Sequence, residues 1–368
     1  MRYHPRASAA LAIAAASLVE SRPPLSPSTT ETSRRWLPGS DKIRGVNLGS
    51  QFIIEPWMVG DEWNSMGCGG SADEWSCVQH LGQDAADAAF RTHWQTWITV
   101  GDLQEIKSYG LNTVRIPYYP RGGLEYLDYI VGNCTELGIY VIMDLHGGPG
   151  SQFPGQQYTG HVLSSPGFYT GDNYERAYKF LEWMTERAHT NPAYFNVGML
   201  QVINEPVHAG DYPSQAANMI ANYYPGAWNR IRGREAQLGI ADSDKLHIQF
   251  MVRDAWGSAT QDSYISAACS DNRGGSDIIV GEWSISVADD AQYNGEFDIR
   301  NTNANNDWYK KFFAAQAQAF ERSGGWVFWS WKCNWIAGFN EWRWCYKSAV
   351  DAGIIPKDAA SAAGTSPC

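Results

Sequence analysis

The sequence has no excess of positive charge and little that could enter a membrane. Its 28 lysines and arginines stand against 39 aspartates and glutamates, which gives a formal net charge of −11. A nucleic-acid partner requires a basic surface, so this balance argues against one. Beyond the N-terminal 20 residues no apolar run is long enough to span a bilayer, and we expect no membrane contact. No cluster of His, Cys and Asp has metal-ligand spacing, so we expect no metal and no cofactor.

Aromatic residues, by contrast, are abundant. The chain contains 17 tryptophans and 19 tyrosines. One interpretation is a large aromatic core. The other is that several rings form platforms for sugars, because pyranose rings present apolar C–H faces. The sequence leaves both open.

The N-terminus has the order of residues that is typical of a secretory signal. Two arginines precede an apolar run rich in small residues at 7–19, which is too short to cross a membrane. We therefore expect a signal peptide at 1–20 and a disordered lead-in, rich in Pro, Ser and Thr, at 21–40. The remainder, 41–368, is predicted to be a single domain, because it shows no internal repeat and no second domain.

Seven cysteines in a secreted chain are expected to pair, with one left over. Cys68 and Cys77 flank a short loop that contains glycine, and Cys333 and Cys345 flank another. These two pairs are the expected disulfides. The pairing of the others stays open at this point: Cys134, Cys269 and Cys368.

Apolar runs alternate with segments of helical periodicity along the whole domain. Seven runs are predicted to be strands: 43–49, 112–117, 139–145, 197–203, 247–252, 278–280 and 325–331. Strands that are apolar throughout imply a parallel sheet covered on both faces. We predict an α/β fold, a (β/α)8 TIM barrel that is either complete or lacks its sixth strand. A doubly wound sheet is the alternative, but the first strand lacks the Gly-rich phosphate loop and helix that this fold usually carries.

Polar residues follow several of these strands, at the edge where a barrel holds its active site. Glu205 follows one strand directly after Asn204, and Glu282 follows another. A strand-end carboxylate by itself is more often paired with a cation for structural reasons. Here Arg115 and His146 end neighbouring strands, and glycoside hydrolysis requires a pair of carboxylates. Glu205 and Glu282 are therefore the candidate catalytic pair.

Seven motifs, in this order, resemble those of glycoside hydrolase family 5. They are RGVNLG at 44–49, EPW at 55–57, NTVRIP at 112–117, DLHG at 144–147, NEP at 204–206, GEW at 281–283 and WSWK at 329–332. Within the family the chain is most similar to fungal endo-β-1,6-glucanases, on the segments 61–63, 66–69, 77–81 and 93–99. Fungal exo-β-1,3-glucanases are next, since they share the EPW and WSWK motifs. The resemblance extends from about residue 44 to about residue 356.

The resemblance implies a role for each matching residue. Glu205 would be the acid/base and Glu282 the nucleophile of a retaining O-glycosyl hydrolase, and Arg115 would keep the nucleophile ionised. The other implied contacts are to the substrate: Asn204 to the sugar 2-hydroxyl, His146 at the −1 subsite, Trp329 beneath the reacting sugar and Glu55 to a further hydroxyl. Structural alternatives remain open for three of them, namely core packing for Trp329, an ion pair for Glu55 and a buried core position for His146.

One family feature is missing from the sequence. The family places a His-any-Tyr pair at the end of its sixth strand, and the segment between 252 and 278 has room for one helical connection only. Either coding sequence has been lost or the chain is a naturally shortened relative. The expected function is a secreted, monomeric endo-β-1,6-glucanase, extracellular or cell-wall associated, acting on β-glucan polysaccharide or oligosaccharide. The alternatives are an exo-β-1,3-glucanase and a non-catalytic glucan-binding protein.

Overall fold

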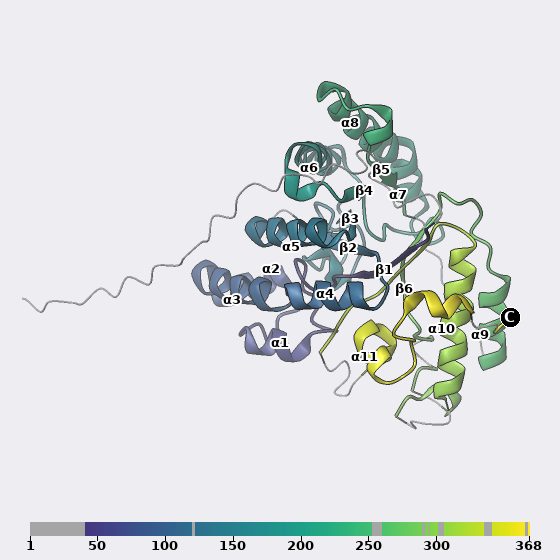
Figure 1. Cartoon of the computed structure of the whole chain (residues 1–368). Coiled ribbons are helices and arrows are strands. Elements are labelled where there is room, and N and C mark those ends of the chain that lie inside the picture. Colours follow the sequence, from purple (N-terminus) through teal and green to yellow (C-terminus); the bar gives the residue numbers. More distant parts are fainter. Residues whose placement is uncertain are drawn as a thin grey trace, which may run out of the picture. The chain divides into compact units, whose positions relative to one another are not determined.

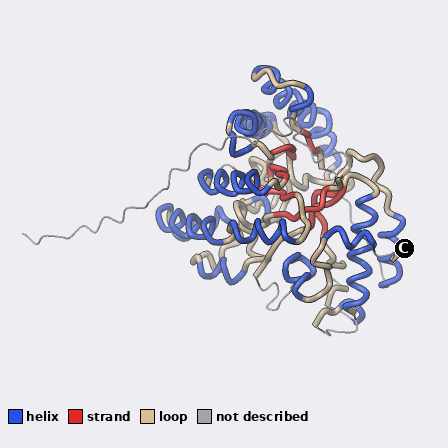
Figure 2. Tube along the Cα trace, viewed as in Figure 1, coloured by secondary structure: helices blue, strands red, loops and turns tan. Residues whose placement is uncertain are grey.

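Seven parallel strands form one sheet at the centre of the described chain (Figures 1 and 2). They are β1 (Ile43–Asn47), β2 (Thr113–Tyr118), β3 (Tyr140–Leu145), β4 (Val197–Gln201), β5 (His247–Gln249), β6 (Val280–Trp283) and β7 (Gly325–Phe328). Their order is β5-β4-β3-β2-β1-β7-β6. This is the order of a (β/α)8 barrel in which the described residues supply no strand between β5 and β6. The predicted α/β barrel class is confirmed, and the position without a described strand is the one that the sequence suggested.

The computed structural model describes residues 41–119, 122–251, 260–288, 291–293, 295–300, 305–334, 341–364 and 367–368. All of them belong to one compact unit, Arg34–Cys368. The expected signal peptide at 1–20 and lead-in at 21–40 lie outside the described residues. In the part that is described, no helix combines the length and the apolar character needed to cross a membrane.

Helices connect the strands, as parallel neighbours require. They are α1 (Gly60–Ser65), α2 (Glu74–Leu81), α3 (Gln83–Thr96), α4 (Val100–Ser108), α5 (Leu124–Leu137), α6 (Gly171–Thr190), α7 (Pro213–Asn218), α8 (Tyr224–Gln237), α9 (Gln261–Ser270), α10 (Asn306–Glu321) and α11 (Tyr346–Asp351). Two helix boundaries follow from local residue chemistry. The side chains of Thr99 and Asp102 cap the start of α4, and Gly138 ends α5 in a left-handed conformation. Helices α1 and α2 occupy a segment rich in Gly, Ser and Trp.

Several strands differ from their predicted bounds. β4, β5 and β7 end two to three residues early, although irregular bonds continue beyond β4: the N–H of Val202 donates to Gln249 O at 3.1 Å. β6 begins at Val280, because Ile278 still belongs to a turn in which its N–H bonds Gly275 O. Glu282 consequently lies within β6 and not beyond it.

The inward-facing side chains fall into two layers. The lower layer is apolar and packs as one buried cluster: Ile43, Tyr140, Ile142, Met199 and Val327. Further along the strands, at positions two or four residues later on the same face, the side chains become polar. This upper layer contains Asn47, Arg115, Asp144, Gln201 and Gln249, and register places Asn47 beside Arg115 and Gln201 beside both Asp144 and Gln249. The sheet thus carries a polar floor at the carboxyl ends of its strands.

Three disulfides are formed. The expected pairs Cys68–Cys77 and Cys333–Cys345 are confirmed. The pairing that the sequence left open is Cys269 of α9 with the last residue, Cys368. Cys134 is the free cysteine and is buried in α5.

Candidate active site

Arg115 is the centre of the polar layer and is fully buried. Three amide side chains hold its guanidinium: Nε donates to Gln201 Oε1 at 2.8 Å, Nη1 to Asn47 Oδ1 at 2.7 Å and Nη2 to Asn204 Oδ1 at 2.6 Å. Asn47 also donates to carbonyls of β6 and β7, including Gly281 O at 3.2 Å. Arg115 is therefore fixed by groups from several strands, and it ties the expected sugar contact Asn204 to the floor.

Two carboxylates complete the surroundings of this guanidinium. Arg115 Nη2 lies 2.9 Å from Asp144 Oδ2, and both side chains are fully buried. Arg115 Nη1 lies 3.3 Å from Glu282 Oε2, and the Glu282 side chain is 20% exposed. The structure thus brings Arg115 and Glu282 together, while Asp144 takes up part of the positive charge. Asp144 stood in a recognised motif, but it was not among the expected site residues.

Glu205 and Glu282 line the same cavity, which has a volume of about 720 Å³. Burial and the negative charge of Glu205 raise the pKa of Glu282 to about 8, against the opposing effect of Arg115 and His146. Glu205 is half-buried, and its φ of +31° is unusual for a residue other than glycine. The two carboxyl groups therefore interact electrostatically, and Glu282 keeps its proton to a higher pH than an ordinary carboxyl group does.

His146, Glu55 and Trp329 form a second group in the site, beside Arg115. His146 Nδ1 donates to Asp144 Oδ2 at 2.6 Å, and its ring stacks on Trp329 at 5.5 Å between centroids. Its Nε2 lies 3.6 Å from Glu55 Oε1, and neither of these buried atoms has a hydrogen-bond partner among the described residues. Burial lowers the pKa of His146, but the Asp144 and Glu55 carboxylates outweigh it and raise that pKa to about 9. Two buried polar atoms are thus left able to bind a ligand's hydroxyls.

The structure therefore gathers the expected residues in two connected groups. Glu282, Arg115 and Asn204 form one, and His146, Glu55 and Trp329 form the other, linked through Asp144. Trp329 is buried, with 3% of its surface exposed. Glu55 is also held by Trp57, whose Nε1 donates to Glu55 Oε2 at 2.8 Å and whose ring is partly exposed.

Sequence reasoning missed Asp144 and Gln201 in this network. It also missed Met251, whose sulfur accepts from Gln201 Nε2 at 3.3 Å. The signal for the first two was a polar residue inside an otherwise apolar strand, on the inward face. Met251 gave no such signal, because a methionine in an apolar segment normally indicates a side chain that packs in the core. No tyrosine hydroxyl within the described chain bonds Glu282, which agrees with the missing His-any-Tyr pair.

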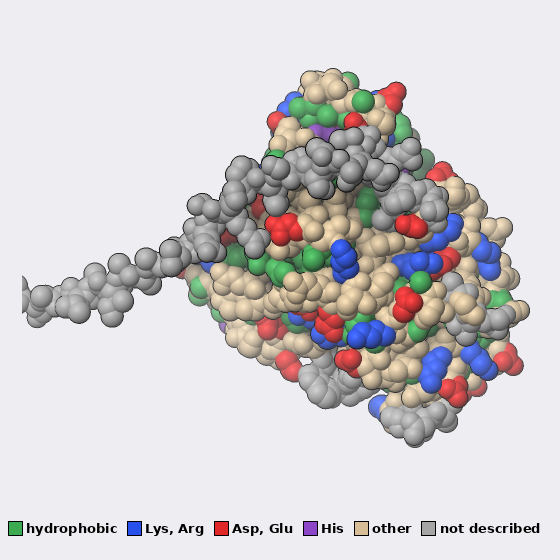
Figure 3. All heavy atoms as spheres, viewed as in Figure 1, with side chains coloured by type: hydrophobic (Ala, Val, Ile, Leu, Met, Phe, Trp, Pro, Cys, Tyr) green, Lys and Arg blue, Asp and Glu red, His purple; other side chains and the backbone are tan. Residues whose placement is uncertain are grey.

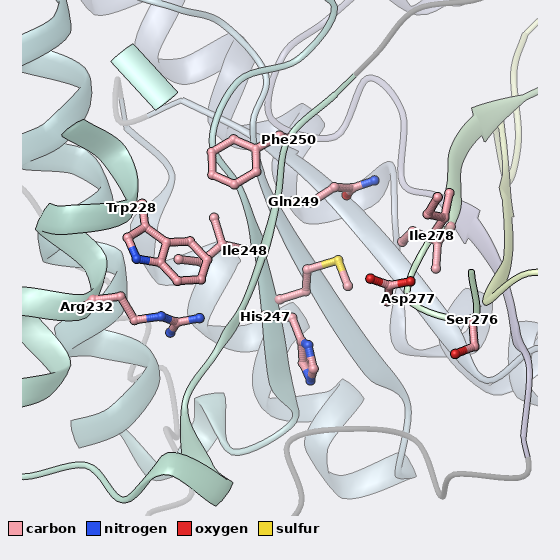
Figure 4. A pocket seen from close by; sticks show the side chains of 11 residues that line it. Trp228, Arg232, His247, Ile248, Gln249, Phe250, Ser276, Asp277 and Ile278 are labelled. Carbon is pink, nitrogen blue, oxygen red and sulfur yellow. The ribbon is translucent and has the colours of Figure 1, made fainter. Parts of the chain in front are cut away.

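A further cavity adjoins that of Glu205 and Glu282 and is lined by residues of β5 and by the segment before β6. This second cavity of about 520 Å³ shares Gln249, Phe250, Ile278 and Ile279 with the first. Figure 4 shows the Gln249 side chain pointing from β5 toward the segment of Ile278. A Cβ on Gly281 of β6 would lie 2.9 Å from Gln249 Nε2, so this one side chain reaches the opposite strand.

On the face shown in Figure 3, acidic and basic side chains are interspersed and do not form a field of one sign. The residues that the structure describes contain no group of three or more His, Cys, Asp or Glu side chains that could hold a metal ion.

Comparison with known proteins identifies the family. The cellulase family, glycosyl hydrolase family 5, matches residues 78–241. The glucan endo-1,6-beta-glucosidase B of Emericella nidulans is 45% identical and covers 92% of this chain and 91% of its own. That alignment spans 384 positions, more than the 368 residues here, so the relative has residues without a counterpart in this chain. A probable glucan endo-1,6-beta-glucosidase B of Neosartorya fischeri is 42% identical, covering 92% of this chain and 93% of that protein.

More distant proteins agree with this placement. A probable glucan 1,3-beta-glucosidase A of Aspergillus fumigatus is 28% identical over 85% of this chain and 87% of its own. The crystal structure of rutinosidase from Aspergillus niger superposes with a TM-score of 0.66 at 19% identity, covering 88% of this chain and 99% of that one. This last likeness shows the fold alone. From the identity and extent of the matches to the curated relatives, the chain belongs to glycosyl hydrolase family 5.

Proposed function

We propose that the chain is a retaining endo-β-1,6-glucanase. Glu282 attacks the anomeric carbon while Glu205 protonates the leaving oxygen, and the glycosidic bond breaks as the glycosyl-enzyme bond forms. Water, deprotonated by Glu205, then releases the sugar from Glu282. The observation that carries the proposal is that these two carboxyls line one cavity and interact strongly enough to raise the pKa of Glu282.

The charges around the pair support this chemistry. Two cations, Arg115 and protonated His146, face four carboxyl groups in the connected network: Glu55, Asp144, Glu205 and Glu282. The negative charges in this network outnumber the positive ones, and this excess favours a proton on the carboxyl pair. Arg115 is 3.3 Å from Glu282 and favours the ionised nucleophile.

The substrate contacts follow from the unpartnered atoms. Glu55 Oε1 and His146 Nε2 are buried without a hydrogen bond in the described chain, and sugar hydroxyls would satisfy both. Asn204 presents its amide beside Arg115 for the 2-hydroxyl. Trp329 is held against His146 and would form the floor of the subsite.

The linkage rests on the relatives. Those that are 40–45% identical are named glucan endo-1,6-beta-glucosidase B, whereas those named 1,3-beta-glucosidases are 28% identical. We therefore assign β-1,6-glucan as substrate, with exo action on β-1,3-glucan as the alternative. Three disulfides support secretion, to the medium or the cell wall. The proposal includes a monomer that needs no cofactor.

A second candidate is a glucan-binding protein without turnover. The observation that favours it is the gap beside β6, the strand that carries Glu282, together with the lack of a tyrosine contact to that carboxylate in the described chain. Such a protein would keep the sugar contacts of Glu55 and His146 but would lack some of the contacts that fix the Glu282 carboxylate.

One experiment separates these readings. The purified protein is incubated with a linear β-1,6-glucan and, separately, with a β-1,3-glucan, and new reducing ends and product lengths are measured. Oligosaccharides from β-1,6-glucan support the proposal. Glucose alone from β-1,3-glucan supports the exo alternative, and binding to either polymer without new reducing ends supports the non-catalytic one.

A further inference from the structure

The sulfur of Met251 accepts two N–H hydrogen bonds at the active site. Its Sδ lies 3.0 Å from the main-chain nitrogen of Glu205 and 3.3 Å from Gln201 Nε2. Met251 follows β5 by two residues, is half-buried and lines the cavity of the two catalytic carboxyls. A thioether is a weak acceptor and methionine usually fills apolar space, so two convergent N–H donors are unusual.

The main chain at Glu205 has a conformation that must be held in place. Its φ of +31° lies in a region that residues with a side chain rarely adopt, and such a conformation persists only where the surroundings fix it. Two carbonyls of this turn are already bound: Gln152 Nε2 donates to Asn204 O at 2.9 Å, and the Tyr158 hydroxyl donates to Glu205 O at 3.3 Å. The N–H of Glu205 is bound from the side of β5, by Met251.

The same sulfur connects Glu205 to the support of the other carboxylate. Gln201 donates to Met251 through Nε2 and accepts from Arg115 Nε at 2.8 Å through Oε1. Arg115 in turn contacts Glu282 at 3.3 Å. A chain of four contacts thus runs from the main chain of one catalytic residue to the carboxylate of the other.

We propose that Met251 is a positioning residue that fixes the left-handed turn at Glu205 and so aims its carboxyl at the bond that Glu282 attacks, an inference that rests on the proposed acid/base role of Glu205. Met251 does not touch the reacting atoms. It acts through the N–H of Glu205 and through Gln201, both of which donate to its sulfur.

The test is the variant Met251→Leu, which keeps the volume and apolar character but removes the acceptor. Met184→Leu is the matched control, because Met184 is fully buried in α6 outside the site. Two quantities are measured in each protein: the exchange rate of the Glu205 amide hydrogen by NMR, and kcat and KM on β-1,6-glucan. We expect Met251→Leu to exchange this amide about tenfold faster and to lose about tenfold in kcat with KM nearly unchanged, since one hydrogen bond contributes about a factor of ten. Met184→Leu should match the wild type in both.

The two readouts separate this inference from the proposed function. If the wild type turns over glucan and Met251→Leu matches it in exchange rate and kcat, the positioning role is wrong. Faster exchange of the Glu205 amide in a protein that has no activity on any glucan would uphold the contact and reject the proposed function. Unchanged exchange in an inactive protein would reject both.

Discussion

Arg115 Nη1 lies 3.3 Å from Glu282 Oε2, and this is the longest of the contacts that the guanidinium makes. Asn47, Gln201, Asn204 and Asp144 hold the same group at 2.6–2.9 Å. The cation is therefore fixed by the scaffold and shared with Asp144, so Glu282 receives only part of its stabilisation. Burial and the negative charge of Glu205 outweigh this contact, so the pKa of Glu282 stays raised although an arginine is beside it.

The two carboxyls should respond differently to the leaving group. Glu205→Ala should lower turnover of β-1,6-glucan by about a hundred- to ten-thousandfold, because the leaving alkoxide needs a proton. On an aryl glucoside with an acidic phenol, which leaves without that proton, bond cleavage in this variant should fall by less than about tenfold. Glu282→Ala should abolish turnover of both substrates. Pre-steady-state release of the phenol checks this, and equal losses for the two variants on the aryl glucoside would contradict the assigned roles.

The pH dependence of the nucleophile should move when Glu205 loses its charge. The negative charge of Glu205 is one cause of the raised pKa of Glu282, which lies at about 8. In Glu205→Gln that pKa should fall, so cleavage of the aryl glucoside should reach its plateau at lower pH than in the wild type. A pH profile of kcat/KM on the aryl substrate measures this. A profile in Glu205→Gln that stays in place, or moves to higher pH, would show that the carboxyls are not coupled.

His146 should make stability depend on pH in the alkaline range. Its pKa is raised from 6.5 to about 9 in the folded protein, so the folded chain binds a proton that the unfolded chain has released. The resulting stabilisation is complete below about pH 6.5 and is lost as the pH rises through about 9, with a size of about 3 kcal/mol. Urea unfolding at pH 6 and pH 9.5 checks this.

Both proteins in this comparison carry Glu282→Gln, so that titration of Glu282 does not contribute. One of them also carries His146→Gln. The free energy of unfolding should fall between the two pH values more in the protein that retains His146. Equal changes in both proteins would mean that His146 is neutral when folded.

The start of β7 should tolerate no side chain. Gly325 has a φ of +119°, and a Cβ there would lie 2.0 Å from Ile43 O, a main-chain atom of β1. Gly325→Ala should therefore destabilise the protein by about 3 kcal/mol or more, by strain and collision together. Gly353→Ala is the control, because Gly353 has a φ of +68° and open space around it, and it should cost about 1 kcal/mol. Equal losses in urea unfolding would show that β1 and β7 are not packed this closely.

Much of the fold could be predicted from the sequence, because the alternation of apolar runs with helical segments and the polar residues after those runs indicate the same barrel. The helix caps at Thr99 and Gly138 and two of the three disulfides follow from local residue types. The ends of β5 and β6 were less predictable, because a strand end depends on the neighbouring strand, and the described residues supply none between these two. β6 begins two residues late because a turn occupies Ile278.

The site was predictable where side-chain type implies chemistry, and less so where tertiary contacts decide it. Glu282 and Arg115 could be named because they were expected at strand ends; they lie within β6 and β2, and the structure places them in contact. The raised pKa of Glu282 and the thioether contact of Met251 could not be named, because both arise from groups that are far apart in the chain and meet only in the folded barrel.

The central claim is a double displacement on β-1,6-glucan at Glu282, and the configuration of the first product tests it most directly. Proton NMR is recorded on the anomeric signals within minutes of mixing the enzyme with a β-1,6-linked glucan oligosaccharide, before mutarotation. The account predicts that the new reducing end appears first as the β-anomer and only later equilibrates, with no signal from Glu282→Gln. A new reducing end that appears first as the α-anomer, or one that Glu282→Gln releases at the wild-type rate, would contradict it.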